Sequence, residues 1–205
     1  MKRLGILLSG RGSNFEAIAK NIDAGELEAE IVAVISNRPD AAGLEIARAR
    51  GLQSVVLPSK GVDREEFDCR VVAELENRGV ELVCLAGFMR LLTARFCRAF
   101  PMRILNIHPS LLPAFPGLDA QKQALEHGVK ISGCTVHFVD EDLDAGPIIL
   151  QAVVPVQDTD DEHSLSARIL KEEHRVYSEA VKIVLEGNYR IEGRRVLHGA
   201  DMPKK

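Results

Sequence analysis

Tryptophan is absent from this 205-residue chain, and aromatic side chains make up only 4% of it. Proteins that bind single-stranded nucleic acid stack the bases on aromatic side chains, so this class of partner is disfavoured. The 26 basic and 30 acidic residues leave a formal net charge of −4. No global positive charge therefore favours nucleic acid or an anionic membrane, and an anionic ligand would have to be bound locally.

Cysteine is sparse, and its spacing is informative. The four cysteines form no Cys-x-x-Cys pair and no close cluster with histidine; they are Cys69, Cys84, Cys97 and Cys134. This spacing argues against a zinc site and indicates buried free thiols, so we expect no metal. The chain has no apolar run of about 18 residues, and its apolar start is too short for a signal peptide. We therefore expect a soluble cytoplasmic protein.

What the chain does have is a regular alternation of apolar runs and helical periods, which is typical of βαβ units wound around a parallel sheet. Asp63 and Thr93 are expected to be N-caps of the third and fourth helices. The predicted strands are residues 3–8, 30–35, 53–57, 81–85, 103–108, 131–139 and 147–154, with a terminal hairpin at 189–197. The predicted helices are residues 14–24, 41–50, 64–78, 94–100, 120–127 and 164–186.

This order of elements predicts an α/β fold, with a doubly wound, mostly parallel sheet flanked by helices. The 46% hydrophobic content supplies enough apolar side chain for a core. No interdomain linker, internal repeat or low-complexity segment interrupts the pattern. We therefore expect a single domain over residues 1–200, followed by a polar tail at residues 201–205.

A glycine loop, Ser9-Gly10-Arg11-Gly12-Ser13-Asn14, joins the first predicted strand to the first helix. Its backbone N–H groups and the positive helix end make a ready anion site. Phe15 replaces the third glycine of a dinucleotide fingerprint, and the Gly-Lys-Ser/Thr of a P-loop is missing. Two readings remain: a monophosphate cradle formed by Gly12, Ser13 and Asn14, or a tight turn in which Ser13 or Asn14 only caps the helix.

Two polar side chains of catalytic types, Asn106 and His108, stand two residues apart at the end of the fifth predicted strand. Alternate strand residues point the same way, and α/β folds place their chemistry at the carboxyl ends of strands. Asp144, in a later acidic loop, would stabilise a protonated His108 that acts as a general acid, while Asn106 donates to an oxyanion. The Asn-x-His pair alone is explained as well by an ordinary strand end. His137 has two readings: a ligand contact, if it shares a face with the crevice, or a hydrogen-bonded structural histidine, which is favoured.

Five motifs occur together in one order along the chain. They are Ser9-Gly10-x-Gly12-Ser13-Asn14, Ala86-Gly87-Phe88-Met89-Arg90, Asn106-Ile107-His108-Pro109-Ser110-Leu111-Leu112-Pro113, Phe115-Pro116-Gly117 and Asp142-Leu143-Asp144-x-Gly146-Pro147-Ile148. Jointly they closely resemble the phosphoribosylglycinamide formyltransferases, nearly end to end. The resemblance implies the formyltransferase fold, with a Rossmann-like, phosphate-binding N-terminal half and a C-terminal half that binds folate and carries the catalytic loop. It also implies formyl transfer from the co-substrate 10-formyltetrahydrofolate to the amine of 5′-phosphoribosylglycinamide in de novo purine synthesis.

The resemblance assigns residues to each role. The catalytic residues would be Asn106, His108 and Asp144. Phosphoribosylglycinamide would be bound by Gly12, Ser13, Asn14 and Glu173. Folate would be bound by Arg64, Met89, Arg90, Leu91, Leu92, Asn106, Asp140, Glu141, Asp142, Leu143 and Asp144. Two positions depart from the family pattern: Leu170, where a polar residue would be a more obvious ligand, and Asp119, where some relatives have histidine.

Three alternatives compete with this interpretation. Methionyl-tRNA formyltransferase and formyltetrahydrofolate hydrolase resemble the same core, but they carry an extra C-terminal or N-terminal domain, which we do not expect in a chain of this length. The third alternative is a non-catalytic nucleotide-binding module that uses the glycine loop alone; the joint presence of Asn106, His108 and Asp144 speaks against it. We expect the two small-molecule substrates as partners, no nucleic acid, no membrane, and a monomer or weak homodimer.

Overall fold

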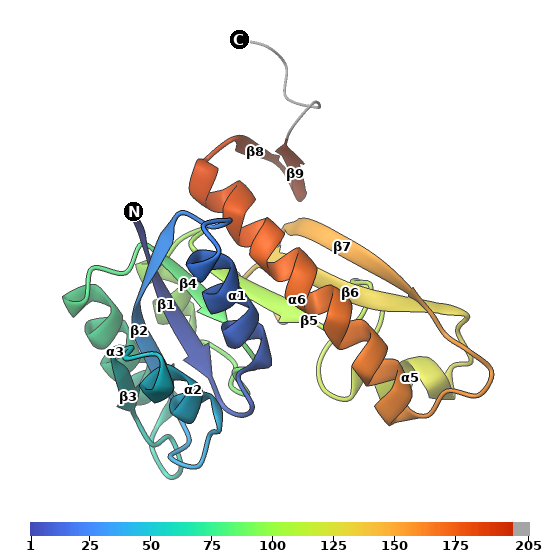
Figure 1. Cartoon of the computed structure of the whole chain (residues 1–205), viewed down its shortest axis with the longest axis horizontal. Coiled ribbons are helices and arrows are strands. Elements are labelled where there is room, and N and C mark those ends of the chain that lie inside the picture. The colour runs from blue at the N-terminus through green and yellow to red at the C-terminus, as the bar shows by residue number, and fades with distance from the viewer. Residues whose placement is uncertain (199–205) are drawn as a thin grey trace. The chain divides into compact units, whose positions relative to one another are not determined.

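The computed structural model describes residues 1–198 (Figure 1), so the predicted polar tail lies outside the described residues. Every predicted strand and helix corresponds to an observed element, with ends that differ by at most two residues. In chain order the elements are β1 (Lys2–Leu8), α1 (Ser13–Asp23), β2 (Ala29–Ser36), α2 (Gly43–Ala49), β3 (Ser54–Val56), α3 (Arg64–Asn77), β4 (Leu82–Leu85), α4 (Ala94–Ala99), β5 (Ile104–His108), α5 (Ala120–Glu126), β6 (Ile131–Phe138), β7 (Ile148–Pro155), α6 (Glu162–Glu186), β8 (Tyr189–Glu192) and β9 (Arg195–His198).

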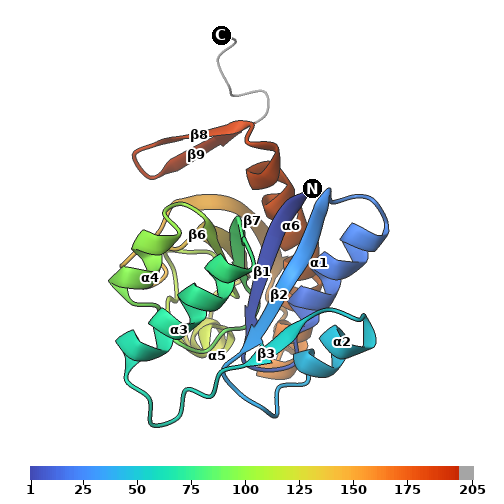
Figure 2. The same ribbon diagram turned by 90° about the vertical axis from the view of Figure 1, so that its left-hand side faces the viewer.

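The chain forms two compact units, each described here by itself. The first comprises Met1–Asn106 with Val139–Glu141, and the second comprises Ile107–Phe138 with the chain from Asp142 onward. The first unit contains parallel strands in the order β3-β2-β1-β4-β5. Figure 2 shows α1 and α2 on one face of β1 and β2, and α3 and α4 on the other. The predicted doubly wound arrangement is therefore confirmed.

This strand order determines where a ligand site can form in the first unit. The chain winds outward from β1 to β3, then returns through α3 to place β4 on the other side of β1. The boundary between β1 and β4 is thus the topological switch point, and ligands of doubly wound sheets bind there, beyond the carboxyl ends of the strands. Two loops leave the sheet at this boundary: the glycine loop after β1 and residues 86–93 after β4.

The third helix shows how local chemistry determines an element. Asp63 caps α3, accepting hydrogen bonds from the N–H groups of Glu65 (2.9 Å) and Glu66 (3.1 Å). These bonds stabilise the carboxylate and hold the pKa of Asp63 below its ordinary value. The apolar residues spaced four apart along the helix are all buried in the core of the first unit; they are Phe67, Val71 and Leu75. Both the cap and the buried face of this helix were predicted.

The second unit combines an antiparallel strand pair with the longest helix. β6 and β7 pair antiparallel, and α6 packs along both strands (Figure 1). The predicted terminal hairpin is present as β8 and β9, and β9 also pairs in parallel with β7 through Ile148 and Arg195. Most strand pairs of the protein are parallel, as predicted. No helix within residues 1–198 has the length and apolar character needed to cross a membrane.

The predicted start of α6 at residue 164 is wrong by two residues. Asp161 is the N-cap: it accepts from the Ser164 N–H at 2.7 Å, while Ser164 Oγ accepts from the Asp161 N–H at 3.0 Å. Ser164 is therefore the third residue of the helix and the partner of Asp161 in a reciprocal capping box, not the residue that begins the helix.

Candidate active site

The glycine loop after β1 enters α1 through Gly12, which is the N-cap and has a left-handed φ of 75°. A Cβ at this position would lie only 2.7 Å from the Gly43 Cα at the start of α2. Gly43 in turn donates its N–H to the Gly10 carbonyl at 3.0 Å. Ser13 and Asn14 are helical residues here and not the cap, so the capping alternative is wrong. Helix α1 therefore begins after a glycine N-cap, which has no side chain that could cap the helix.

The segment after β4 lies directly beside this loop. The Ser9 N–H donates to the Gly87 carbonyl at 3.0 Å, and the Met89 N–H donates to Ser9 Oγ at 2.8 Å. Two large apolar side chains point outward from the segment: Met89 is 66% exposed and Leu91 is 53% exposed. Between them, the Arg90 guanidinium lies 4.6 Å from the ring centroid of Phe67. A hydrogen-bonded backbone thus presents apolar side chains to solvent, which is typical of a binding surface.

Strand β5 carries both Asn106 and His108. Asn106 is half-buried and pairs in register with Leu85 of β4. His108, at the end of the strand, is 5% exposed. The amide and the imidazole therefore belong to one strand and alternate on it as the sequence predicts, which directs them to the same face.

His108 has an acceptor at each ring nitrogen. Nε2 lies 2.8 Å from the Phe115 carbonyl oxygen, and Nδ1 lies 3.4 Å from Oδ2 of Asp144. A neutral imidazole carries one N–H, whereas an imidazolium carries two. Acceptors at both ring nitrogens fix the orientation of the imidazole.

Asp144 connects two histidines with the loop after β5. Its Oδ2 accepts from the Gly117 N–H at 2.8 Å, and its Oδ1 lies 3.8 Å from Nε2 of His137. His137 is buried, and its Nδ1 lies 2.8 Å from the Phe138 carbonyl. Because a carbonyl only accepts, this nitrogen is the donor, and Nε2 is the atom that faces the carboxylate. His137 therefore belongs to this cluster, a placement that the sequence left undecided.

The loop that supplies the Phe115 carbonyl is held by a buried side chain that the sequence analysis missed. Thr135 of β6 donates to the Ser110 carbonyl at 2.7 Å and accepts from the Leu112 N–H at 3.0 Å. Gln151 of β7 donates both to Thr135 Oγ1 and to the Leu112 carbonyl, each at 2.9 Å. The sequence signal was weak, because Thr135 is one of several polar residues on β6, together with Ser132 and His137.

Comparison with known proteins identifies the family. The model of the formyl transferase family matches residues 2–181. The chain belongs to the formyl transferase family.

Relatives within this family can be compared over most of the chain. Phosphoribosylglycinamide formyltransferase of Escherichia coli is 40% identical over 97% of this chain and 94% of its own length. The crystal structure of glycinamide ribonucleotide transformylase 1 from Symbiobacterium toebii has a TM-score of 0.93 and 53% identity, covering 96% of this chain and 93% of that one. The trifunctional purine biosynthetic protein adenosine-3 of Drosophila melanogaster is 49% identical over 91% of this chain. The chain spans only 14% to 19% of the length of the trifunctional relatives that it matches.

The remaining predicted residues of the first unit lie at its surface. Arg64 is the exposed first residue of α3. The Asp140 carbonyl accepts from Cys97 Sγ at 3.3 Å, and Glu141 forms an exposed ion pair with Arg98 at 3.1 Å. Burial, followed by the nearby acidic side chains, raises the pKa of Cys97 to about 11. This thiol is therefore a hydrogen-bond donor that anchors the acidic loop, and the folate-binding role of these residues stays a prediction.

In the second unit, Glu173 is 8% exposed on α6. Burial raises the pKa of Cys134 to about 12, with a further contribution from the charge of Glu173. Leu170 is half-buried on the same helix, and Asp119 is an exposed residue at the start of α5 with a left-handed φ of 56°. Asp142 and Leu143 are exposed in the acidic loop. Their roles stay predictions, as does that of Glu173.

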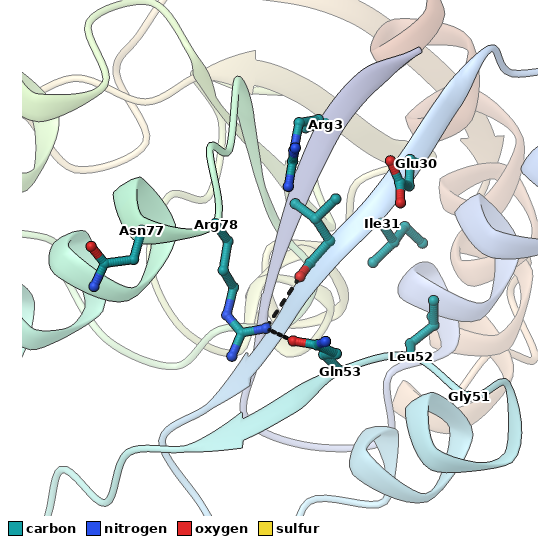
Figure 3. A pocket seen from close by; sticks show the side chains of 9 residues that line it. Arg3, Glu30, Ile31, Gly51, Leu52, Gln53, Asn77 and Arg78 are labelled. Atoms are coloured by element: carbon teal, nitrogen blue, oxygen red, sulfur yellow. Dashed lines mark hydrogen bonds between the residues drawn. The ribbon is translucent and has the colours of Figure 1, made fainter.

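The first unit of this formyl transferase also has a polar hollow of about 410 Å³ (Figure 3). Arg78 crosses it to donate to the Val32 carbonyl and to the Gln53 side chain. Arg3 and Glu30, which also line it, stand at the amino ends of β1 and β2. This is the end of the strands opposite to the switch-point loops, so the hollow is not the expected ligand site. Within residues 1–198, no cluster of His, Cys, Asp and Glu is arranged to hold a metal ion.

Proposed function

We propose that this protein transfers the formyl group of 10-formyltetrahydrofolate to the amine of 5′-phosphoribosylglycinamide in de novo purine biosynthesis. The products are 5′-phosphoribosyl-N-formylglycinamide and tetrahydrofolate. The observation that carries the proposal is His108, which has an acceptor at both ring nitrogens, one of them the Asp144 carboxylate. The name of the Escherichia coli relative, phosphoribosylglycinamide formyltransferase, supports the same reaction.

The chemistry requires a polarised carbonyl and a proton for the leaving nitrogen. The substrate amine attacks the formyl carbon, and a C–N bond forms while the carbonyl electrons move to oxygen. Asn106 and His108 donate to this oxyanion. When it collapses, the bond to the folate nitrogen breaks, that nitrogen gains a proton through His108, and the new amide loses its extra proton to solvent. A positioned general acid contributes about 10² to 10⁴ in rate, and one oxyanion donor about 10² to 10³.

Binding roles complete the proposal. The phosphate of phosphoribosylglycinamide binds the N–H groups of Gly12, Ser13 and Asn14, since a helix N-terminus attracts anions, and Glu173 binds the same substrate. Asp144 keeps His108 protonated, and its loop contributes to folate binding. The full folate-binding set is Arg64, Met89, Arg90, Leu91, Leu92, Asn106, Asp140, Glu141, Asp142, Leu143 and Asp144. We place the enzyme in the cytoplasm, as a monomer or weak homodimer.

A spectrophotometric assay with purified protein tests the reaction. We expect tetrahydrofolate to form only when both 10-formyltetrahydrofolate and phosphoribosylglycinamide are present. Release of formate in the absence of the amine would instead identify a hydrolase. Absence of turnover by a protein that binds both substrates would refute the assignment as an enzyme and leave a binding module.

A further inference from the structure

Residues 89–92 of the first unit combine irregular backbone with exposed apolar side chains. They belong to no helix or strand, and two of them, Met89 and Leu91, expose most of a large apolar side chain. Exposed apolar side chains on irregular backbone have little packing to hold them in place. Its conformation therefore depends on the residues around it, and buried polar side chains form hydrogen bonds to the backbone at Met89 and at Thr93.

Ser9 holds the first end. Its side chain is buried, and its Oγ accepts from the Met89 N–H at 2.8 Å while donating to Oδ1 of Asn37 at 2.6 Å. Asn37 donates in turn to Ser59 Oγ at 3.1 Å. Because Asn37 receives the hydroxyl proton of Ser9, a lone pair of the same oxygen is directed at the Met89 N–H. Side chains at the ends of β1 and β2 thus fix the direction in which the segment starts.

Asp68 holds the second end. This carboxylate on α3 is 1% exposed, and its Oδ2 accepts from the Thr93 N–H at 2.6 Å. Thr93 then caps α4 by accepting from the Phe96 N–H. The other oxygen of Asp68 has no hydrogen-bond partner within residues 1–198. Burial of a carboxylate with so few partners is unfavourable for folding, so a neutral residue would serve stability better.

The middle of the segment is held by the neighbour of Asp68. Phe67 lies beneath the Arg90 guanidinium, whose carbon is 4.6 Å from the ring centroid. Phe67 itself is 1% exposed and stacks with Phe88 at a centroid distance of 6.5 Å. Two successive residues of α3 therefore hold Arg90 and Thr93, while Ser9 holds Met89.

We infer that Ser9 and Asp68 are positioning residues that hold residues 89–92 in the conformation that binds the folate co-substrate. Each acts through a backbone N–H at one end of the segment: Ser9 through that of Met89, and Asp68 through that of Thr93, the residue that follows the segment. The inference rests on the proposed function, because it assigns these four residues to folate.

Four variants test the inference: Ser9→Ala, Asp68→Ala, Asp68→Asn and the control Ser132→Ala. Ser132 is a buried serine of β6, in the second unit, 3% exposed like Ser9. Loss of one hydrogen bond of this kind should weaken folate binding about tenfold. We expect this increase in the KM for 10-formyltetrahydrofolate in Ser9→Ala and Asp68→Ala, with kcat and the KM for phosphoribosylglycinamide nearly unchanged. Asp68→Asn should restore most of the affinity, because its amide oxygen can still accept from Thr93.

Calorimetric titration with the non-transferring isomer 5-formyltetrahydrofolate separates this inference from the proposed function. If the wild-type protein binds this folate but transfers no formyl group from 10-formyltetrahydrofolate, the proposed function fails while the affinity ratios still test positioning. Wild-type affinity in both Ser9→Ala and Asp68→Ala would overturn the inference. An equal loss of folate affinity in Ser132→Ala would also overturn it, because it would indicate a general effect of losing a buried hydroxyl. An equal loss of affinity in Asp68→Asn would overturn it as well, because it would indicate a role for charge. Thermal unfolding checks that each variant is folded. Ser9→Ala removes only one heavy atom, so it still tests the inference if Asp68→Ala does not fold.

Discussion

Replacing Asp144 by asparagine removes one negative charge at almost constant volume. The amide oxygen of asparagine can still accept from the Gly117 N–H, which is 2.8 Å from the carboxylate in the structure. The loop around it should therefore be preserved. What is lost is the charge 3.4 Å from Nδ1 of His108, so the substitution tests the electrostatic role of Asp144 separately from its structural one.

The size of the effect can be worked out from this distance. Two unit charges 3.4 Å apart attract each other by about 5 kcal/mol at an effective dielectric constant of about 20. That constant is appropriate because the side chains of His108 and Asp144 are only 6% and 11% exposed. Desolvation of the pair offsets part of the attraction. General-acid catalysis is typically worth about 10² to 10⁴ in rate, so we expect kcat to fall about 10³-fold in Asp144→Asn.

Steady-state kinetics with both substrates measures this loss, and thermal unfolding checks that the variant is folded. Asp158→Asn is the matched control, because Asp158 is 86% exposed and forms an ion pair with Lys130 at the surface; its kcat should stay near the wild-type value. The double variant Asp144→Asn with His108→Ala should be no slower than the worse single variant, since the two residues act as one unit. A kcat within about threefold of wild type in a folded Asp144→Asn protein would refute the proposed role of the carboxylate.

Three further substitutions test other parts of the structure. Gly12→Ala should lower the free energy of unfolding by about 1–3 kcal/mol in urea titrations, because alanine is strained at a φ of 75° and would contact backbone at 2.7 Å; unchanged stability would contradict the tight contact. Thr135→Val should cost about 1–3 kcal/mol by leaving the buried Leu112 N–H without its acceptor, and it should lower kcat more than its loss of stability explains; a wild-type kcat would show that the loop needs no such support. Two hydrogen bonds from Arg168 are the main reason that the pKa of Asp160 lies far below its ordinary value of 3.8. The unfolded chain therefore takes up a proton below about pH 4 while the native state does not, so the free energy of unfolding decreases as the pH is lowered through this range. Asp160→Asn should lose less stability than wild type between about pH 5 and pH 3, and an equal loss would contradict this assignment.

Features that depend on neighbouring residues in the sequence were predictable. The cap at Asp63 and the buried spacing of Phe67 and Val71 depend only on chemistry within one helix. The start of α6 was misjudged even though its signal is local, because Asp161 and Ser164 cap each other and the serine resembles a helix start when read alone. The secondary structure and the doubly wound arrangement could therefore be predicted from the sequence pattern, except for a helix end that is determined by reciprocal side-chain hydrogen bonds.

Features that depend on contacts between distant segments were not predictable. The sequence places His108 at a strand end, but the acceptor at its Nε2 is the carbonyl of Phe115, a non-glycine residue with a left-handed φ of 52°. Nothing in the residue type of Phe115 indicates that conformation. In the same way, the bond from the Met89 N–H to Ser9 joins residues 80 positions apart. Such contacts appear only once the strands are arranged in order.

The division of the chain has a consequence for how the protein can be cut. The backbone passes from the first unit to the second after Asn106, returns for Val139–Glu141, and leaves again at Asp142. The returning piece completes the first unit, because the Val139 N–H donates to the Ile104 carbonyl and the Asp140 carbonyl accepts from Cys97. A fragment ending at residue 106 lacks these partners, so a proteolytic nick or a split-reporter junction at that point does not divide the chain into its two units. During synthesis, the first 106 residues leave the ribosome before residues 139–141, which complete their unit.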